Sequence, residues 1–239
     1  MNREYMIVHS LEDLAETAAA LWYKFSTEAV ISHGHFSVAL SGGSTPRHLF
    51  RKLSQNSHDF PWKNTKIFQV DERHVIRTHE DSNFRMISDE LLSGIKIPPQ
   101  NIYSIPVNST VEKDAEKYSE LLSDYFQNRN SEYTFDLLLL GLGSDGHTAS
   151  LFPDDPALEI TDRQAVHVYK NEIMHDRISI TFPVINNAKN IIFLISGFDK
   201  SEPAFNVIKQ LDTSLPAGKI SHKGDNLIYL LDESAAALF

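Results

Sequence analysis

Apolar and polar residues follow two different periods along the chain, and each period predicts a kind of element. Apolar residues recur at helical spacing from Leu11 to Phe25, directly after Ser10, whose side chain can cap a helix. Short, mostly apolar runs at Phe36 to Leu40 and Phe135 to Leu140 predict strands, and the second run is the most apolar strand of the chain. Such continuous runs are typical of parallel strands that are covered on both faces.

The same criteria predict further elements in the rest of the chain. Strands are expected at Lys66 to Val70, Val166 to Tyr169, Ile178 to Phe182, Ile191 to Ile195 and Leu227 to Leu231, and helices at Pro46 to Leu53, Ser82 to Leu92, Thr110 to Phe126 and Ser201 to Leu211. Because strands and helices alternate, we expect an α/β fold, Rossmann-like, with a mainly parallel sheet flanked by helices and some additional strands in the C-terminal half. No linker or repeat interrupts the pattern, which favours a single domain over residues 1–239, with room for a small lobe after about residue 150.

Composition narrows the classes of function. The 239 residues carry 22 Lys plus Arg against 32 Asp plus Glu, a formal net charge of −10, and no cysteine. This charge disfavours nucleic acid or an anionic membrane as a partner, because both need a basic face. The lack of cysteine excludes disulfides, thiolate nucleophiles and Cys-type metal sites. With no apolar run near the ~20 residues of a membrane span and no targeting segment, we expect a soluble, cytoplasmic protein.

Glycines gather at two places, and the first follows the strand that ends at Leu40. The loop consists of Ser41, Gly42, Gly43, Ser44 and Thr45, and Pro46 then suits the first turn of a helix. At the carboxyl ends of parallel strands, helix N-termini present free N–H groups that favour an anion. The loop lacks the Gly-Lys-Ser/Thr ending of a nucleotide P-loop, so a monophosphate or carboxylate is favoured over a nucleotide. A plain turn capped by serine is the alternative.

The second group of glycines follows the most apolar strand. Gly141, Gly143 and Gly146 surround Asp145, and His147 stands two residues after that carboxylate. Histidine titrates near neutral pH and can act as a base or an acid, and a neighbouring aspartate can hold its tautomer. We interpret His147 as a candidate general base and Asp145 as its partner. A solvated or structural histidine is the alternative.

Charged residues follow other strands as well. Asp71 and Arg73 come directly after the strand Lys66 to Val70, Arg177 begins a strand, and Lys200 stands at a strand-to-helix turn. These cations are candidates for binding an anion, and Asp71 for orienting a group or accepting a proton. Ordinary solvated charges are the alternative.

A metal site is a weaker hypothesis. The candidate ligands lie close together in the sequence: His74, His79, Glu80 and Asp81. No two of them have the His-x-x-x-His spacing that places two ligands on one helical face, so we expect no metal.

Together these segments resemble the 6-phosphogluconolactonase family, within the glucosamine-6-phosphate isomerase/deaminase superfamily. Residues 40–46 resemble the phosphate loop, residues 70–73 with 81–83 a second signature, and residues 141–153 the longest and most specific motif. Residues 177–181, residues 197–200 and the terminal Leu231, Asp232, Ala235 and Ala236 follow in family order. The resemblance covers nearly the whole chain. It departs from the family at Ile76 and Arg77, where a proline is frequent, and at Tyr229, where a tryptophan is common.

The resemblance also separates this chain from related activities. In the deaminase branch a glutamate completes an Asp-His-Glu relay, and here Phe152 stands at that position. That branch also favours tyrosine where this chain has Arg73. A non-catalytic sugar-phosphate sensor should carry a DNA-binding region, for which we expect too little room before residue 39.

The resemblance implies hydrolysis of 6-phospho-D-glucono-1,5-lactone to 6-phosphogluconate, the second step of the oxidative pentose phosphate pathway. His147 would be the general base that activates water and Asp145 would orient it, while residues 41–45 would hold the phosphate with Arg73, Lys200 and Arg177. No metal or organic cofactor is expected, because water is the nucleophile. The expected partner is this small sugar-phosphate lactone, bound by a monomer or a small homo-oligomer. Because the net charge is negative, the overall field of the protein does not attract an anion, so we expect a few fixed hydrogen-bond donors to recognise the phosphate.

Overall fold

The computed structural model describes residues 2–129, 131–169 and 174–239. Its centre is a seven-stranded sheet in the order β1 (Asn2–Val8), β10 (Asn226–Asp232), β9 (Asn190–Ile195), β6 (Leu137–Gly141), β2 (Phe36–Leu40), β3 (Thr65–Gln69) and β5 (Ile102–Tyr103). Each neighbouring pair in this sheet is parallel. The predicted α/β class is therefore confirmed, and the predicted strand at residues 36–40 has the bounds of β2.

A second, three-stranded antiparallel sheet consists of β4 (Asp71–Arg73), β8 (Arg177–Ile180) and β7 (Ala165–Val168). No strand was predicted at residues 71–73, yet their backbone pairs with β8. It also placed Phe182 in a strand, whereas Phe182 begins the short helix α5 (Phe182–Asn186), which has a proline in its first turn. Proline suits a first helical turn and cannot donate to a strand ladder.

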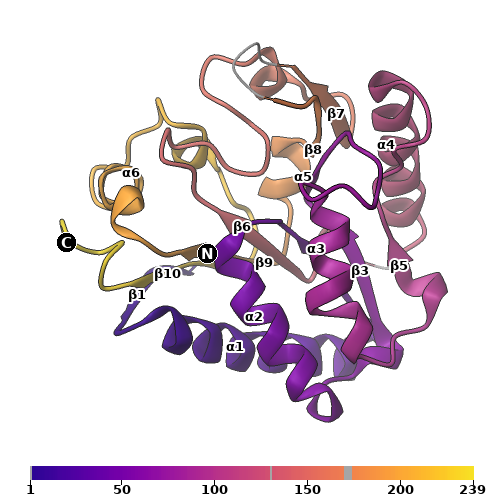
Figure 1. The fold of residues 1–239 in the computed structure, drawn as a ribbon, viewed down its shortest axis with the longest axis horizontal. Helices are drawn as coiled ribbons and strands as arrows, with labels where there is room; N and C mark the ends of the chain where they lie inside the picture. The colour runs from indigo at the N-terminus through magenta and orange to yellow at the C-terminus, as the bar shows by residue number, and fades with distance from the viewer. Residues whose placement is uncertain (1, 130, 170–173) are drawn as a thin grey trace.

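Helices cover both faces of the large sheet (Figure 1). One face packs against α1 (Leu11–His33), α2 (Ser44–Gln55) and α3 (Asn83–Glu90), and the other against α4 (Val111–Gln127), α5 and α6 (Ser201–Ile208). Three of these helices begin where the sequence supplies a side-chain cap: Ser10, Ser82 and Thr110 each accept a backbone N–H of the first turn. None of the helices among the described residues combines the length and the apolar character that a membrane crossing requires.

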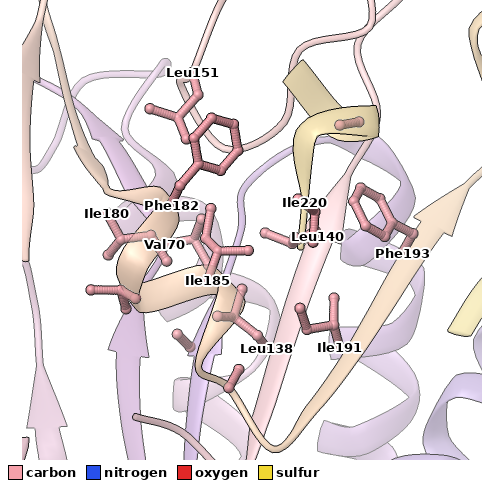
Figure 2. Packing of buried hydrophobic residues seen from close by; sticks show 14 of the residues in the cluster. Val70, Leu138, Leu140, Leu151, Ile180, Phe182, Ile185, Ile191, Phe193 and Ile220 are labelled. Carbon is pink, nitrogen blue, oxygen red and sulfur yellow. The ribbon is translucent and has the colours of Figure 1, made fainter. Parts of the chain in front are cut away.

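Alternate residues of the central strands enter two hydrophobic clusters, one on each face of the sheet. Leu137 and Leu139 of β6 join the cluster under α1 and α2, while Leu138 and Leu140 join the cluster that holds the small sheet. Figure 2 shows Leu138 and Leu140 gathered with side chains of β8, β9 and α5: Ile180, Ile191, Phe193, Phe182 and Ile185. Because the two sheets share this core, we propose that the chain folds as a single domain.

The strand order locates the place where a ligand can bind. From β2 the chain passes to β3 and β5 on one side, and then returns to β6 on the other side of β2. In open α/β sheets, ligands bind beyond the carboxyl ends of the strands where the order reverses in this way. Both glycine-rich loops of the sequence follow the two strands at this point, β2 and β6.

Candidate active site

A cavity of about 310 Å³ lies beyond the carboxyl ends of β2 and β6. Ten of the residues that the sequence analysis proposed line it: Ser41, Gly42, Gly43, Ser44, Thr45, Asp71, Arg73, His147, Arg177 and Lys200. The eleventh, Asp145, contacts the cavity through His147. The wall also includes residues that the sequence analysis did not propose as site residues, among them Asn83, Ser150, Phe152 and Ser196.

His147 and Asp145 form a hydrogen-bonded pair at the end of β6. The Nδ1 atom of His147 lies 2.5 Å from Oδ1 of Asp145, and the backbone N–H of His147 donates to the same oxygen at 3.1 Å. Burial alone would raise the pKa of Asp145, but the charge and hydrogen bonds of His147 outweigh it and hold this pKa below its ordinary value. An ionised carboxylate only accepts, so Nδ1 of His147 is the donor of this hydrogen bond, and in the neutral imidazole the lone pair is then on Nε2.

The glycines of this loop let the pair come close to the backbone. A Cβ atom added to Gly143 would lie 2.1 Å from Nδ1 of His147 and 2.6 Å from Oδ1 of Asp145, so only glycine leaves room for both side chains. Gly146 has a φ of 80°, a conformation that glycine adopts without strain. The turn closes through hydrogen bonds from Gly143 N–H to the His147 carbonyl and from Gly146 N–H to the Gly143 carbonyl.

The first glycine loop ends at the N-terminus of α2. Gly43 is the N-cap residue with a φ of 115°, so no side chain caps the first-turn N–H groups of Ser44 and Thr45. Gly42 is required for a different reason, since a Cβ there would lie 1.8 Å from Oδ1 of Asn83. Ser41 lines the cavity as predicted, and its hydroxyl donates to the Leu139 carbonyl at 2.9 Å, so its proton is already used within the fold.

Two arginines face each other across the small sheet. Arg73 of β4 and Arg177 of β8 are directly opposite in the antiparallel register, a placement that normally destabilises a sheet because the charges repel. Burial, and then the charge of Arg73, lower the pKa of Arg177. Nη1 of Arg177 is buried without a hydrogen-bond partner among the described residues. This arrangement favours a bound anion that would satisfy both guanidinium groups.

Lys200 reaches the same cavity from the turn after β9. Its Nζ lies 2.9 Å from Oδ2 of Asp199, a largely exposed carboxylate. The turn is held by Asp232 of β10, which accepts hydrogen bonds from the Ser196 hydroxyl and from Gly197 N–H. In the sequence, Asp232 stands out only as part of the terminal motif. Because β10 lies next to β9 in the sheet, its carboxylate can reach the turn after β9 and hold it.

A buried polar network holds the residues around Arg73. The Asp71 carboxylate accepts the Ser150 hydroxyl at 2.7 Å, and the Asn83 amide donates to the Asp71 carbonyl at 3.0 Å. Glu72 accepts the backbone N–H groups of Asn83 and Phe84 at the start of α3, each at 2.7 Å. Burial raises the pKa of Glu72 despite these hydrogen bonds. Asn83 and Ser150 lie within two motifs of the sequence, residues 81–83 and residues 141–153, but local sequence does not indicate that both contact Asp71.

The fold and the cavity together define an α/β protein of the enzyme type, with the His147–Asp145 pair and three cationic side chains, Arg73, Arg177 and Lys200, around one cavity. The family model described as glucosamine-6-phosphate isomerases/6-phosphogluconolactonase matches residues 9–229, and the chain belongs to this family.

Individual relatives agree with this assignment. The chain is 38% identical over 213 residues to a 6-phosphogluconolactonase of Synechocystis, covering 87% of each protein. It is 34% identical over 252 residues to a probable 6-phosphogluconolactonase 2 of Oryza sativa subsp. indica, covering 99% of this chain and 90% of the relative. Among solved structures, 6-phosphogluconolactonase from Trypanosoma cruzi superposes with a TM-score of 0.87 at 25% identity, covering 100% of this chain and 98% of that one.

Proposed function

We propose that this chain hydrolyses the ring ester of 6-phospho-D-glucono-1,5-lactone to 6-phosphogluconate, in the oxidative pentose phosphate pathway. The names of the relatives support this substrate. The observation that carries the proposal is the convergence of one imidazole and three cationic side chains (His147, Arg73, Arg177 and Lys200) on one cavity. A phosphorylated lactone needs both features: a base for water at the ester and cations for the phosphate.

His147 is the general base in this proposal. Its Nε2 takes a proton from a water molecule as the water oxygen attacks the lactone carbonyl carbon, and the carbonyl π electrons move onto the oxygen to form a tetrahedral oxyanion. Asp145, held against Nδ1 at 2.5 Å, stabilises the imidazolium that results. As the oxyanion re-forms the carbonyl, the bond to the ring oxygen breaks and that oxygen takes the proton from Nε2. The product acid then releases a proton to solvent.

The phosphate binds at the other end of the cavity in this proposal. The uncapped N–H groups of Ser44 and Thr45 and the guanidinium groups of Arg73 and Arg177 all favour a dianion. Charge-assisted hydrogen bonds of this kind contribute roughly 1.5–3 kcal/mol each before desolvation. Binding would also relieve the repulsion between the two arginines, which gives the phosphate an advantage over a neutral group.

The position of Phe152 disfavours the isomerase or deaminase activity of the same family. Its ring packs against the ring of His147 with centroids 4.7 Å apart, and the residue is 7% exposed. The deaminase branch has a glutamate at this position, whose carboxylate shares proton transfer with the histidine. Phenylalanine has no group that exchanges protons, so the ring supports the orientation of His147 and leaves a single base.

The test is to follow freshly generated 6-phosphogluconolactone by NMR or by proton release. The wild-type chain should open the lactone well above the spontaneous rate, and His147→Ala should lose about 10²–10⁴-fold in kcat, as for removal of a general base. A wild-type rate equal to spontaneous hydrolysis would refute the function. A His147→Ala variant with normal turnover would refute the role of His147 alone. The unphosphorylated lactone, run in parallel, measures what the phosphate site contributes, and ammonia release from glucosamine 6-phosphate would indicate the deaminase instead.

We further propose that the chain acts in the cytoplasm as a monomer or a small homo-oligomer. The complete absence of cysteine is consistent with a compartment in which disulfides are not used. Size-exclusion chromatography with light scattering gives the oligomeric state, and localisation of a tagged chain gives the compartment.

A further inference from the structure

A second cluster of potential ligands lies outside the proposed catalytic groups. It consists of His79 and Asp81, in the loop between β4 and α3, and His175, two residues before β8. The ligand atoms of the three side chains lie within 4.8 Å of one another. Oδ2 of Asp81 is 3.0 Å from Nε2 of His175 and 3.7 Å from Nδ1 of His79. His79 and His175 belong to chain segments far apart in sequence, which is why sequence spacing predicts no metal here.

The chemistry of the three groups matches a transition metal. Two imidazole nitrogens and one carboxylate oxygen are a donor set that Zn²⁺ prefers, whereas Mg²⁺ and Ca²⁺ prefer oxygen ligands alone. Nδ1 of His79 accepts the backbone N–H of Asp81 at 3.1 Å, so this nitrogen carries no proton, and a metal ion bound there replaces that hydrogen bond. The side chains are between 21% and 40% exposed, which leaves a path for an ion to enter.

We propose that His79, Asp81 and His175 bind one divalent transition-metal ion of the Zn²⁺ class, next to Arg73 in the wall of the active-site cavity. Arg73 connects the two sites, because its Nη1 donates to the Asp81 carbonyl at 2.7 Å. Arg177, the other phosphate-facing arginine, stands two residues after His175. The ion therefore ties the loop of residues 74–82 to the segment before β8, and so stabilises the strand pair that carries both arginines.

The other cluster with similar groups is less suitable for a cation. His33, His35 and Asp136 also lie within 4.8 Å of one another. However, Oδ1 of Asp136 accepts a hydrogen bond from Arg129 at 3.1 Å, and its Oδ2 accepts both the N–H and the hydroxyl of Ser37. A guanidinium group thus already neutralises that carboxylate. Among the described residues, no arginine or lysine side chain forms a hydrogen bond or an ion pair with the carboxylate of Asp81.

The test is calorimetric titration of ZnCl₂ into the full chain, prepared without a histidine tag and without substrate. The wild type should bind one Zn²⁺ per chain, and His175→Ala and Asp81→Ala should each lower the affinity at least about 100-fold, since even outer partners of a metal site contribute 10–100-fold. His58→Ala is the matched control, because His58 is 80% exposed and lies outside the cluster. Its affinity should equal that of the wild type.

Thermal unfolding gives a second measurement. Zn²⁺ binds the folded chain, so it should raise the Tm of the wild type and of His58→Ala, and leave that of His175→Ala unchanged. Scans without metal verify that each variant folds, and His79→Ala replaces any variant that does not. Equal affinity in wild type and His175→Ala overturns the proposal, as does loss of binding in His35→Ala, which would place the ion at the other cluster. Because no substrate is present, the result is independent of the proposed function.

Discussion

Gly143 offers a direct test of how the proposed catalytic pair, His147 and Asp145, is held. In a Gly143→Ala variant the new methyl group would lie 2.1 Å from Nδ1 of His147, well inside the 3.4 Å at which ordinary contacts begin. It would also lie 2.6 Å from Oδ1 of Asp145, so both partners of the hydrogen bond must move. The φ of Gly143 is outside the left-handed region, so alanine adopts the backbone conformation without strain. The perturbation is therefore steric and local.

The magnitude follows from the displacement. Moving a catalytic group by about 1 Å costs on the order of 100-fold in rate, and complete loss of a general base costs about 10²–10⁴-fold. We therefore expect kcat of Gly143→Ala to fall about 100-fold or more, with KM for the phosphorylated lactone nearly unchanged. Overpacking typically costs about 1–3 kcal/mol of unfolding free energy, so the variant should remain folded.

Gly141 supplies the matched control in the same loop. A Cβ atom added there meets nothing within 4 Å, so Gly141→Ala leaves the His147–Asp145 pair in place. Because this methyl group faces the cavity, it can change KM, but kcat should remain near the wild-type value. Steady-state hydrolysis of the lactone by both variants, corrected for the spontaneous rate, gives the comparison. Equal kcat for Gly143→Ala and wild type would refute the argument that the position of His147 controls the rate.

Three further perturbations test other parts of the structure. Arg177→Met should raise KM for the phosphorylated lactone about 10- to 100-fold, the equivalent of one charge-assisted hydrogen bond, and leave the unphosphorylated lactone unaffected; equal effects on both substrates would contradict a phosphate contact. Asp145→Asn should be less stable than wild type at pH 6 in urea unfolding. The pKa of Asp145 is lowered in the folded state. The difference in unfolding free energy between variant and wild type should therefore shrink as the pH falls below about 3.9, the ordinary aspartate pKa, and then through the pKa of the folded state. A difference that widens in acid would show that folding raises the pKa of Asp145 instead. Leu138→Ala, at a position with 0% exposure in β6, should cost about 2–5 kcal/mol in chemical denaturation, and a loss well below this would mean that the core repacks around the cavity.

Local pattern predicts much of the fold because several strands are buried on both faces. The bounds of β2 were predicted from its apolar run alone, and those of β6 and β9 to within two residues. It does not predict β4, whose three polar residues become a strand only through hydrogen bonds to β8. At Phe182 the pattern predicts a strand that is not there. The residue has high β propensity, but the proline that follows it lies in the first turn of a helix, and Phe182 begins that helix.

Most residues of the candidate site could be predicted from the sequence for a topological reason. In a parallel sheet, loops after the strands meet at one edge, so polar residues following apolar runs come together even when they are distant in the chain. This brought the residues after β2, β3, β6 and β9 to one cavity. The sequence could not indicate that the Ser41 hydroxyl would be used by the Leu139 carbonyl, or that Asp232 would hold the turn before Lys200.

The amino-acid sequence alone therefore determines the α/β class, the helix caps and the polar side chains at the end of each strand, because these features depend on residues within a few positions in the sequence. The opposition of Arg73 and Arg177, the contact of Ser150 with Asp71 and the meeting of His79 with His175 exist only in the folded molecule. Each joins segments whose separation in sequence carries no periodic signal. Their register is set by how the two sheets pack on a common core, and that packing is a property of the whole chain.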